Sequence, residues 1–240
     1  DGKDVEGIAS QEYFVTKMAH AYKSYPARPK IALPRVNQAT GIDLESVIRG
    51  RRTVRSFSGE PIALEKIARI LFHAYGITGS IPIPHNPHVE QKLRAVPSAG
   101  ALYPLEIYPV VLKSQEIEPG IYHYNVAEHS LEQIKPGNYS EEIGEMCFTK
   151  PFIDIDTSSL VLLLSAVFDR MLFKYQDRGY RFILIEAGHV AQNVSLLCHG
   201  MGMGSVLIGG FLDDALGDLV GLDRDYESII YPIIMGSVKP

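Results

Sequence analysis

The sequence has few cysteines, no long apolar run and no excess of basic residues, and each of these shortages excludes a class of protein. Its two cysteines, Cys147 and Cys198, lie far apart and belong to no CxxC or Cys/His array, so neither a disulfide framework nor a zinc site is predicted. This usage fits a reducing compartment, and we expect the cytoplasm. The longest apolar run, within residues 159–168, is well short of the ~20 residues that span a bilayer, so no membrane span is expected.

The charge balance and the length narrow the class further. Acidic residues outnumber basic ones by 28 to 23, and the formal net charge of −5 argues against a general affinity for nucleic acid or anionic membranes. With 240 residues, 46% of them hydrophobic, the chain can bury one full core of an ordinary globular protein. It begins DGKDVEG, without an initiator methionine or a signal-peptide pattern, so we expect that the original start was trimmed or cleaved.

Hydrophobic periodicity predicts helices and strands in mixed order. Helical spacing of apolar residues predicts helices within 41–52, 62–75, 180–202 and 212–222. Short apolar or alternating runs predict strands at 105–112, 120–125, 129–134, 158–168, 205–211 and 228–238. The proline-rich stretch 80–88 is expected to form a loop. This order favours an α+β fold over a regular βαβ winding.

Proline also divides the chain. Residues 1–40 are expected to form a short helix at 11–22 and an extended arm, because the prolines that follow the helix forbid a continuous helix. Residues 41–240 are expected to form the main domain.

The stretch RGRRTVRSF, residues 49–57, gathers four arginines at a predicted helix exit. Such a cluster is usually a solvated basic turn. Four guanidinium groups repel one another, however, and a phosphate offers three oxygens that they can share. The cluster therefore favours a phosphorylated ligand.

Glycines gather in GMGMGSVLIGG. Gly200, Gly202 and Gly204 close a predicted helix and precede a strand, which indicates C-capping and not a dinucleotide-binding loop. Gly209 and Gly210 follow a strand, where a bare backbone could approach a flat ligand; a plain turn is the alternative.

Other candidate stretches are weaker when taken alone. The small residues of VPSAGALYP, residues 96–104, would leave a groove before a strand. Lys174 and Tyr175 stand side by side in FKYQDRGYRF, where a solvated helix start is the plain alternative. His123 and His129 have no acidic companions at ligand spacing, so no metal site is expected.

Taken in order, several stretches resemble the flavin-dependent nitroreductase superfamily, and within it the SagB-type dehydrogenases, the azoline oxidases of thiazole- and oxazole-modified peptide pathways. These stretches are RRTVRSF, PSAGALYPLEIY, GIYHYN, KYQDRGYRF, EAGHVAQNVSLLCHGMGMGSVLIGGF and PIIMGSV. The resemblance runs from about residue 43 to the C-terminus. It implies a homodimer with FMN at the subunit interface, on a mixed, mainly antiparallel sheet wrapped by helices around a long central helix.

The resemblance also implies roles for single residues. The expected cofactor contacts are Arg51, Arg52 and Thr53 at the phosphate, Arg55 at the pyrimidine edge, Gly209 and Gly210 at N5, and Pro97, Ser98 and Gly100 from the second subunit. The basic tail of the plainest nitroreductases is reduced here to Lys239, for which a phosphate contact is expected.

The pair Lys174-Tyr175 separates this chain from generic nitroreductases, because similar azoline oxidases carry a Lys-Tyr pair at this place. Azoline oxidation removes a ring proton to a base and a hydride to flavin N5. We hypothesise that Lys174, with its pKa lowered by desolvation, is this base and that Tyr175 orients it or relays the proton.

Two alternatives to azoline dehydrogenation stay open. One is a reductase that passes hydride from NAD(P)H to nitroaromatics or quinones. The other is a noncatalytic module that binds an anion or nucleic acid through the arginines, although the acidic net charge and the lack of aromatic residues among the arginines oppose nucleic-acid binding. For an azoline dehydrogenase the expected partners are a cyclodehydratase and a precursor peptide.

Overall fold

The computed structural model describes residues 22–36, 41–83 and 86–239, with the backbone alone at residues 86 and 87. The predicted helix at 11–22 lies almost wholly outside these residues. The described helices are α2 (Leu44–Gly50), α3 (Leu64–Tyr75), α4 (Ser140–Met146), α5 (Asp169–Tyr175), α6 (Arg178–Gly200) and α7 (Asp213–Val220). Two short 3-10 turns are η1 (Ala99–Ala101) and η2 (Ile155–Thr157).

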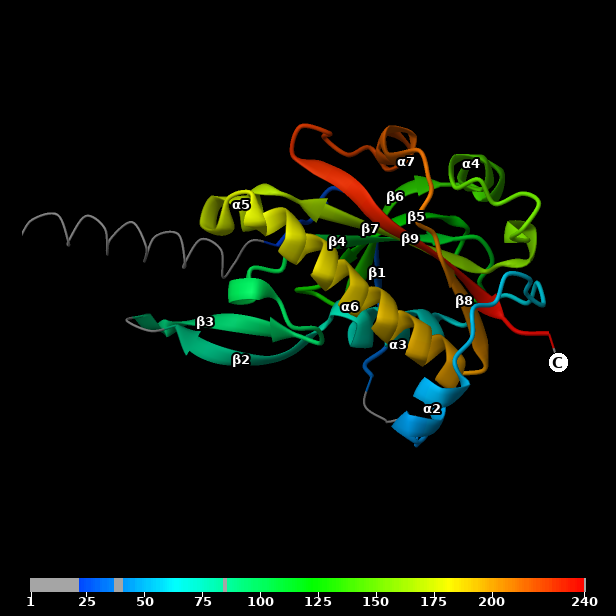
Figure 1. Cartoon of the computed structure of the whole chain (residues 1–240), viewed down its shortest axis with the longest axis horizontal. Coiled ribbons are helices and arrows are strands. Elements are labelled where there is room, and N and C mark those ends of the chain that lie inside the picture. The colour runs from blue at the N-terminus through cyan, green and yellow to red at the C-terminus, as the bar shows by residue number, and fades with distance from the viewer. Residues whose placement is uncertain (1–21, 37–40, 84–85, 240) are drawn as a thin grey trace, which may run out of the picture.

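A seven-stranded sheet forms the centre of the molecule (Figure 1). Its order is β1 (Lys30–Ala32), β6 (Ser130–Pro136), β5 (Gly120–Asn125), β4 (Leu105–Val111), β7 (Leu160–Val167), β9 (Glu227–Ser237) and β8 (Met203–Leu207). Each neighbouring pair is antiparallel. The predicted α+β fold, with a mainly antiparallel sheet and a long helix, is confirmed.

The sheet is buried on both faces, and β7 shows why. Its alternate residues Leu160, Leu162 and Leu164 pack into one apolar core together with residues of α3 and α6. Val161 and Leu163 point the other way, into a second core that includes residues of α4 and α7. Because side chains alternate along a strand, a strand covered on both faces needs an unbroken apolar run. The apolar stretch 158–168 therefore forms the buried strand that its composition predicts.

The predicted loop at 80–88 is wrong. Strands β2 (Ile77–Ile83) and β3 (Asn86–Arg94) form a separate antiparallel hairpin that extends beside the body (Figure 1). Each strand of a two-stranded ribbon has one free edge, where a proline without an N–H group costs no ladder hydrogen bond. Pro82, opposite Glu90, is tolerated for this reason.

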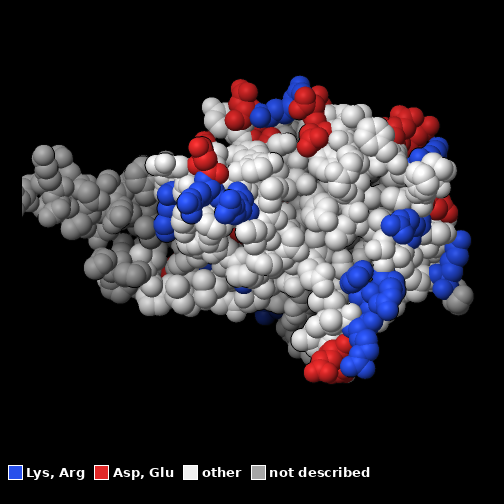
Figure 2. All heavy atoms as spheres, in the orientation of Figure 1, with Lys and Arg blue, Asp and Glu red and all other residues white. Residues whose placement is uncertain are grey.

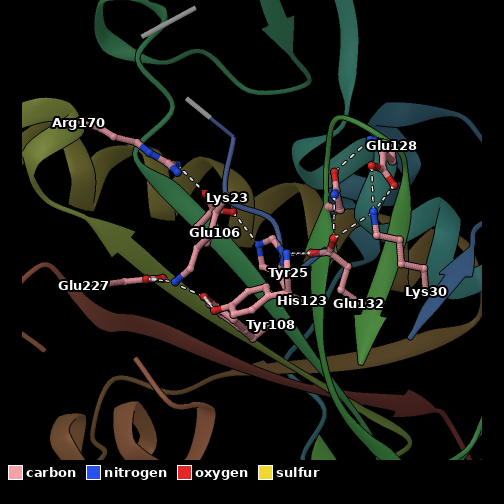
Figure 3. Close-up of polar contacts among 11 residues, drawn as sticks. Lys23, Tyr25, Lys30, Glu106, Tyr108, His123, Glu128, Glu132, Arg170 and Glu227 are labelled. Carbon is pink, nitrogen blue, oxygen red and sulfur yellow. Dashed lines mark hydrogen bonds and ion pairs between the residues drawn. The ribbon is translucent and has the colours of Figure 1, made fainter. Parts of the chain in front are cut away.

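A network of buried charges ties the sheet together (Figure 3). His123 is fully buried, with Nδ1 3.0 Å from Glu132 Oε2 and Nε2 3.0 Å from Glu106 Oε2. Arg170 from α5 pairs with Glu106 Oε1 at 2.6 Å. The expectation that His123 lacks acidic companions is wrong, because both glutamates come from neighbouring strands and not from nearby sequence. No group of three or more potential metal ligands occurs within the described ranges.

The same network holds the extended segment 22–36 against the sheet. The Tyr25 backbone N–H donates to Glu132 Oε2 at 2.8 Å, and Lys23 forms an ion pair with Glu227 of β9. The buried Glu227 also accepts hydrogen bonds from Tyr108 at 3.2 Å and Ser165 at 2.5 Å. This segment therefore bridges both halves of the sheet.

Replacement of Arg170 by leucine tests the network. Burial alone would raise the pKa of Glu106, but the Arg170 charge and the His123 hydrogen bond lower it to about 2. Arg170→Leu leaves a buried carboxylate without its cation, and we expect the free energy of unfolding at pH 7 to fall by about 3–5 kcal/mol.

A carboxyl group whose pKa is lowered by folding contributes stability above its ordinary pKa and loses it as the pH falls through the folded value. The difference in urea stability between wild type and Arg170→Leu should therefore shrink as the pH drops from 5 towards 3. Arg28→Leu, at an exposed arginine, is the control. Equal losses in both variants, or a difference independent of pH, would contradict the assignment.

Candidate functional site

The arginine-rich segment leaves α2 and runs along the edge of the sheet. The Asp43 side chain accepts a hydrogen bond from the Ser46 N–H at 2.8 Å and caps α2, as its sequence predicts. After the helix, Thr53 pairs in parallel with Ser205 of β8, and the Val54 N–H donates to the Ser205 carbonyl at 3.0 Å. The predicted position of the arginines at a helix exit is confirmed.

The guanidinium groups of this segment lie at the surface without an acidic partner. Arg52 and Arg55 are exposed and Arg51 is half-buried. The Arg52 side chain donates to the carbonyls of Arg49 and Arg51 at 2.9 and 2.8 Å. Within the part of the chain that the structure describes, none of these arginines forms an ion pair with a carboxylate. The cluster therefore keeps its capacity for an external anion.

Lys239 lies at the same edge of the sheet. It follows the last residue of β9, Ser237, whose carbonyl accepts from the Ser58 N–H at 2.8 Å. The segment after the arginines thus crosses the end of β9, just before Lys239. Both basic elements reach one end of the β8–β9 pair.

Glycine is required at Gly204 and at Gly202 for different structural causes. A Cβ on Gly204 would lie 2.4 Å from Val54 Cβ, so Gly204 serves the close contact between β8 and the arginine segment. Gly202, with φ +71°, forms the turn after α6. The predicted capping role thus applies to Gly202, whereas Gly204 lies inside a strand.

Gly209 and Gly210 follow β8 and are exposed. A Cβ on either residue would meet nothing within 4 Å, so packing within this chain does not require glycine there. The open backbone at this strand end fits close approach by a group outside the chain. The arginine segment lies along β8, and the glycine pair is the exit of that same strand.

A second group of candidate residues surrounds the turn at η1. Gly100 has φ +64°, and a Cβ on it would lie 2.9 Å from both Lys174 Nζ and Tyr175 Oη. The structure therefore brings the Lys174-Tyr175 pair to this turn. Pro97 and Gly100 are exposed, and Ser98 is half-buried.

The pair itself ends α5. The Tyr175 ring packs edge-on against Phe182, with ring centroids 4.9 Å apart, and Lys174 Nζ lies 5.4 Å from the Tyr175 centroid. Lys174 is exposed in the single chain. The apolar surroundings that the base hypothesis requires are therefore not supplied by this chain alone.

Sequence reasoning missed a buried acid beneath the turn. Glu186, on α6, is 2% exposed and accepts a hydrogen bond from the Tyr75 hydroxyl at 2.6 Å. Burial raises its pKa to about 7, although Ser98, Tyr75 and the Arg94 charge act in the opposite direction. The signal was a single acid within the apolar helical stretch FILIEAG.

The two groups of candidate residues lie at opposite ends of α6. Gly50, which precedes the arginines, approaches His199 near the C-terminal end of α6, since a Cβ on it would lie 2.5 Å from His199 Nε2. Lys174 and Tyr175 lie just before its N-terminal end. The 23 residues of α6 span about 34 Å at 1.5 Å per residue. Within one chain, the arginine segment and the Lys174-Tyr175 pair therefore lie beside different parts of α6.

Charged residues and exposed apolar residues both occur near α2 and near the start of α6. Figure 2 shows Lys and Arg gathered near α2 and around α5 and the start of α6, with a largely uncharged surface between them. On α6, the apolar residues Tyr180, Leu184 and Ile185 are 52%, 43% and 48% exposed. Near α2, Ile42, Leu44 and Ile48 are 46%, 63% and 55% exposed. No helix among the described residues is both long and apolar enough to cross a membrane.

Comparison with known proteins agrees with the fold. Residues 48–237 match the model of the nitroreductase family. A relative from Methanocaldococcus jannaschii, described as a nitroreductase, is 35% identical over 204 residues, which are 85% of this chain and 95% of the relative.

Two further similar proteins are named for peptide toxins. The trifolitoxin-processing protein TfxB of Rhizobium leguminosarum bv. trifolii is 28% identical over 214 residues, or 85% of this chain and 56% of that protein. The Escherichia coli microcin synthetase McbBCD complex, solved with truncated pro-MccB17 bound, contains a similar fold, with a TM-score of 0.64, 23% identity and coverage of 98% of this chain and 94% of that one.

The matched family model covers most of the chain, including the arginine segment, the η1 turn, the Lys-Tyr pair and the glycine pair. The relatives that process peptide toxins agree with the SagB-type resemblance. The chain belongs to the nitroreductase family, in its SagB-type subfamily, and is an oxidoreductase of that family.

Proposed function

We propose that this protein is an FMN-dependent dehydrogenase that oxidises azolines in a modified peptide to azoles. The observation that carries the proposal is the convergence of Lys174 Nζ and Tyr175 Oη on the backbone of Gly100. A generic flavin reductase needs no base at this position, whereas azoline oxidation does. Relatives that process trifolitoxin and microcin B17 support a peptide substrate.

The residues present fit FMN. Arg51, Arg52 and Thr53 offer cationic and hydroxyl donors to the phosphate, and Lys239 reaches the same edge of the sheet. The open backbone at Gly209 and Gly210 leaves room for a flat ring system. Arg55 would place a cation at the pyrimidine edge, where the reduced ring carries negative charge. When bound, FMN supplies the acceptor for the hydride.

Lys174 supplies the base in this proposal. An azoline becomes an azole when a ring proton leaves the former Cα and a hydride leaves the adjacent carbon. Lys174 takes the proton, and the Tyr175 hydroxyl orients the amine or relays the proton from it. Because Lys174 is exposed in the single chain, its desolvation must come from the substrate and a second subunit.

A homodimer would complete the site. Pro97, Ser98 and Gly100 of one subunit would face the arginines and glycine pair of the other. The exposed apolar residues along α6 and near α2 suit burial against a second copy, because large apolar patches on a surface mark interaction sites. A two-fold axis near α6 would bring unlike ends of the two helices together.

The proposed setting is a biosynthetic system with a precursor peptide and a cyclodehydratase that forms the azoline. The microcin synthetase complex, with its peptide bound, supports this setting. We also place the protein in the cytoplasm, which its two free, buried cysteines fit.

A second candidate function is an NAD(P)H-dependent reductase of nitroaromatics or quinones. The Methanocaldococcus jannaschii relative favours it, because this chain covers nearly all of a protein described as a nitroreductase. The exposure of Lys174 also favours it, since the base hypothesis requires apolar surroundings for this lysine. Rapid flavin reduction by NAD(P)H and none by a thiazoline peptide would select this function.

Replacement of Gly209 tests the cofactor site. Gly209→Val should weaken FMN binding at least about tenfold, since a side chain there blocks approach to the backbone, and should leave the urea stability within about 0.5 kcal/mol of wild type. The matched control is Gly79→Val, at another exposed glycine with nothing within 4 Å of its Cβ position. FMN affinity is measured from quenching of flavin fluorescence. Equal affinity in the two variants would contradict this position for the ring.

Replacement of Lys174 tests the base. Lys174→Ala should lower single-turnover reduction of bound FMN by a thiazoline peptide about 10²- to 10⁴-fold, the usual contribution of a general base. FMN binding should change little. Lys150→Ala, at an exposed lysine far along the chain, should behave as wild type. Full azoline oxidation by Lys174→Ala with FMN bound would show that another group takes the proton.

A further inference from the structure

The turn that carries Ser98 and Gly100 is held in a strained conformation by hydrogen bonds. Ala101 and Tyr103 are non-glycine residues with φ of +54° and +48°. The Tyr103 N–H donates to Ser98 Oγ at 2.9 Å, and the Tyr103 hydroxyl accepts from the Arg94 N–H at 3.0 Å. Positive φ values at such residues cost free energy and persist where the surroundings enforce them.

Glu186 lies beneath this turn, and among the described residues only one of its two carboxyl oxygens has a hydrogen-bond partner. Oε1 accepts from the Tyr75 hydroxyl at 2.6 Å, and that hydroxyl in turn accepts from the Leu105 N–H at 3.1 Å. The proton of Tyr75 is therefore committed to Glu186. Glu186 Oε2 is buried and has no hydrogen-bond partner among the described residues. The Ser98 hydroxyl is close enough to influence the carboxyl group.

A hydroxyl group has one donor and two acceptor positions, and this limits what Ser98 can do. One acceptor position takes the Tyr103 N–H. The other acceptor position and the single proton remain for the groups on either side of the turn. Glu186 lies on the inner side, and the cofactor of the proposed function would lie on the outer side.

We propose that Glu186 is a positioning residue that sets the direction in which the Ser98 hydroxyl donates its hydrogen bond. This inference rests on the proposed function, since it takes the outer partner of Ser98 to be FMN. A neutral Glu186 donates from Oε2 to Ser98 Oγ, which leaves the Ser98 proton for the cofactor. An ionised Glu186 accepts a hydrogen bond from the Ser98 hydroxyl, so that this hydroxyl no longer donates to the cofactor.

The surroundings of Glu186 support a change of charge near neutral pH. Burial raises its pKa to about 7, so both forms occur in the physiological range. Facing groups are Tyr75 from α3, Arg94 from β3 and Tyr103 from the turn. Burial raises the pKa of Tyr75 and of Tyr103, so both stay neutral there, and the Arg94 guanidinium remains cationic. Lys174 and Tyr175 contact the turn at Gly100.

Glu186→Gln separates this role from a structural one. The glutamine keeps an oxygen for Tyr75 and donates to Ser98 at every pH, which fixes the arrangement of the neutral acid. The probe is FMN, with its dissociation constant measured by flavin fluorescence from pH 5.5 to 8.5. The ratio of the wild-type constant to that of Glu186→Gln should be about 1 at pH 5.5 and rise through pH 7 to about three- to tenfold, the worth of one hydrogen bond.

Ionisation of the FMN phosphate changes both dissociation constants by the same factor, so its effect cancels in the ratio. In a Ser98→Ala background, Glu186→Gln should have no effect on FMN affinity at any pH. His189→Gln, at an exposed residue of the same helix, is the control and should keep the pH-dependent step of wild type. Near-ultraviolet circular dichroism confirms that each variant is folded.

The outcomes separate this inference from the proposed function. A ratio that stays at 1 across the pH range, or a step that persists in the Ser98→Ala background, overturns the role of Glu186 while FMN binding by wild type still stands. A wild type that binds no FMN at any pH overturns the proposed function and this inference with it. A step at the stated position that disappears without Ser98 supports the role.

Discussion

The length of α6 is the constraint on which the candidate site depends. One end of this helix lies beside the arginine segment, and the other follows the Lys174-Tyr175 pair. This helix of 23 residues is about 34 Å long and holds the arginine segment and the pair apart within one chain, and the proposed homodimer would bring them to one cofactor. The exposed apolar residues Tyr180, Leu184 and Ile185 lie on the helix between them. The same helix thus separates the halves of the site and presents the surface that would join them.

The buried face of α6 has a different role. It packs with α3 and one face of the sheet into an apolar core, and Glu186 is the exception within it. A carboxyl group at such a place costs stability when it is ionised, and a core selected for stability alone would replace it. Its hydrogen bond to Tyr75 and its closeness to Ser98 connect the core to the strained turn. The charges around His123, by contrast, link strands of the sheet to one another and hold the segment 22–36.

Local patterns in the sequence predict the regular elements well, and the partners across strands poorly. The periodicity of α3 and α6, the cap at Asp43 and the buried run of β7 each depend on neighbours in sequence, so each was predictable. The acidic partners of His123 are not visible in its local sequence, because Glu106 and Glu132 reach it only through strand pairing. The prolines of the β2–β3 hairpin predict a loop, because local sequence does not show that they lie on a ribbon with free edges. The roles of the candidate site residues stay predictions, which the resemblance implies. The sequence did not indicate that Lys174 is exposed in a single chain, nor that Glu186 lies beneath Ser98, because both depend on the packing of distant segments.

A subunit-mixing experiment tests the two-chain site most directly. Gly209→Val damages the half that holds the glycine pair, and Lys174→Ala damages the half at the turn. If each site takes one half from each subunit, a mixed dimer has one site with both defects and one intact site. At an FMN concentration that fills wild-type sites but leaves those of Gly209→Val empty, equal amounts of the two variants, dissociated and reassembled together, should then recover up to about a quarter of wild-type azoline oxidation, because about half of the dimers are mixed. No recovery, with mixed dimers demonstrated by differently tagged chains, would contradict a site shared between subunits.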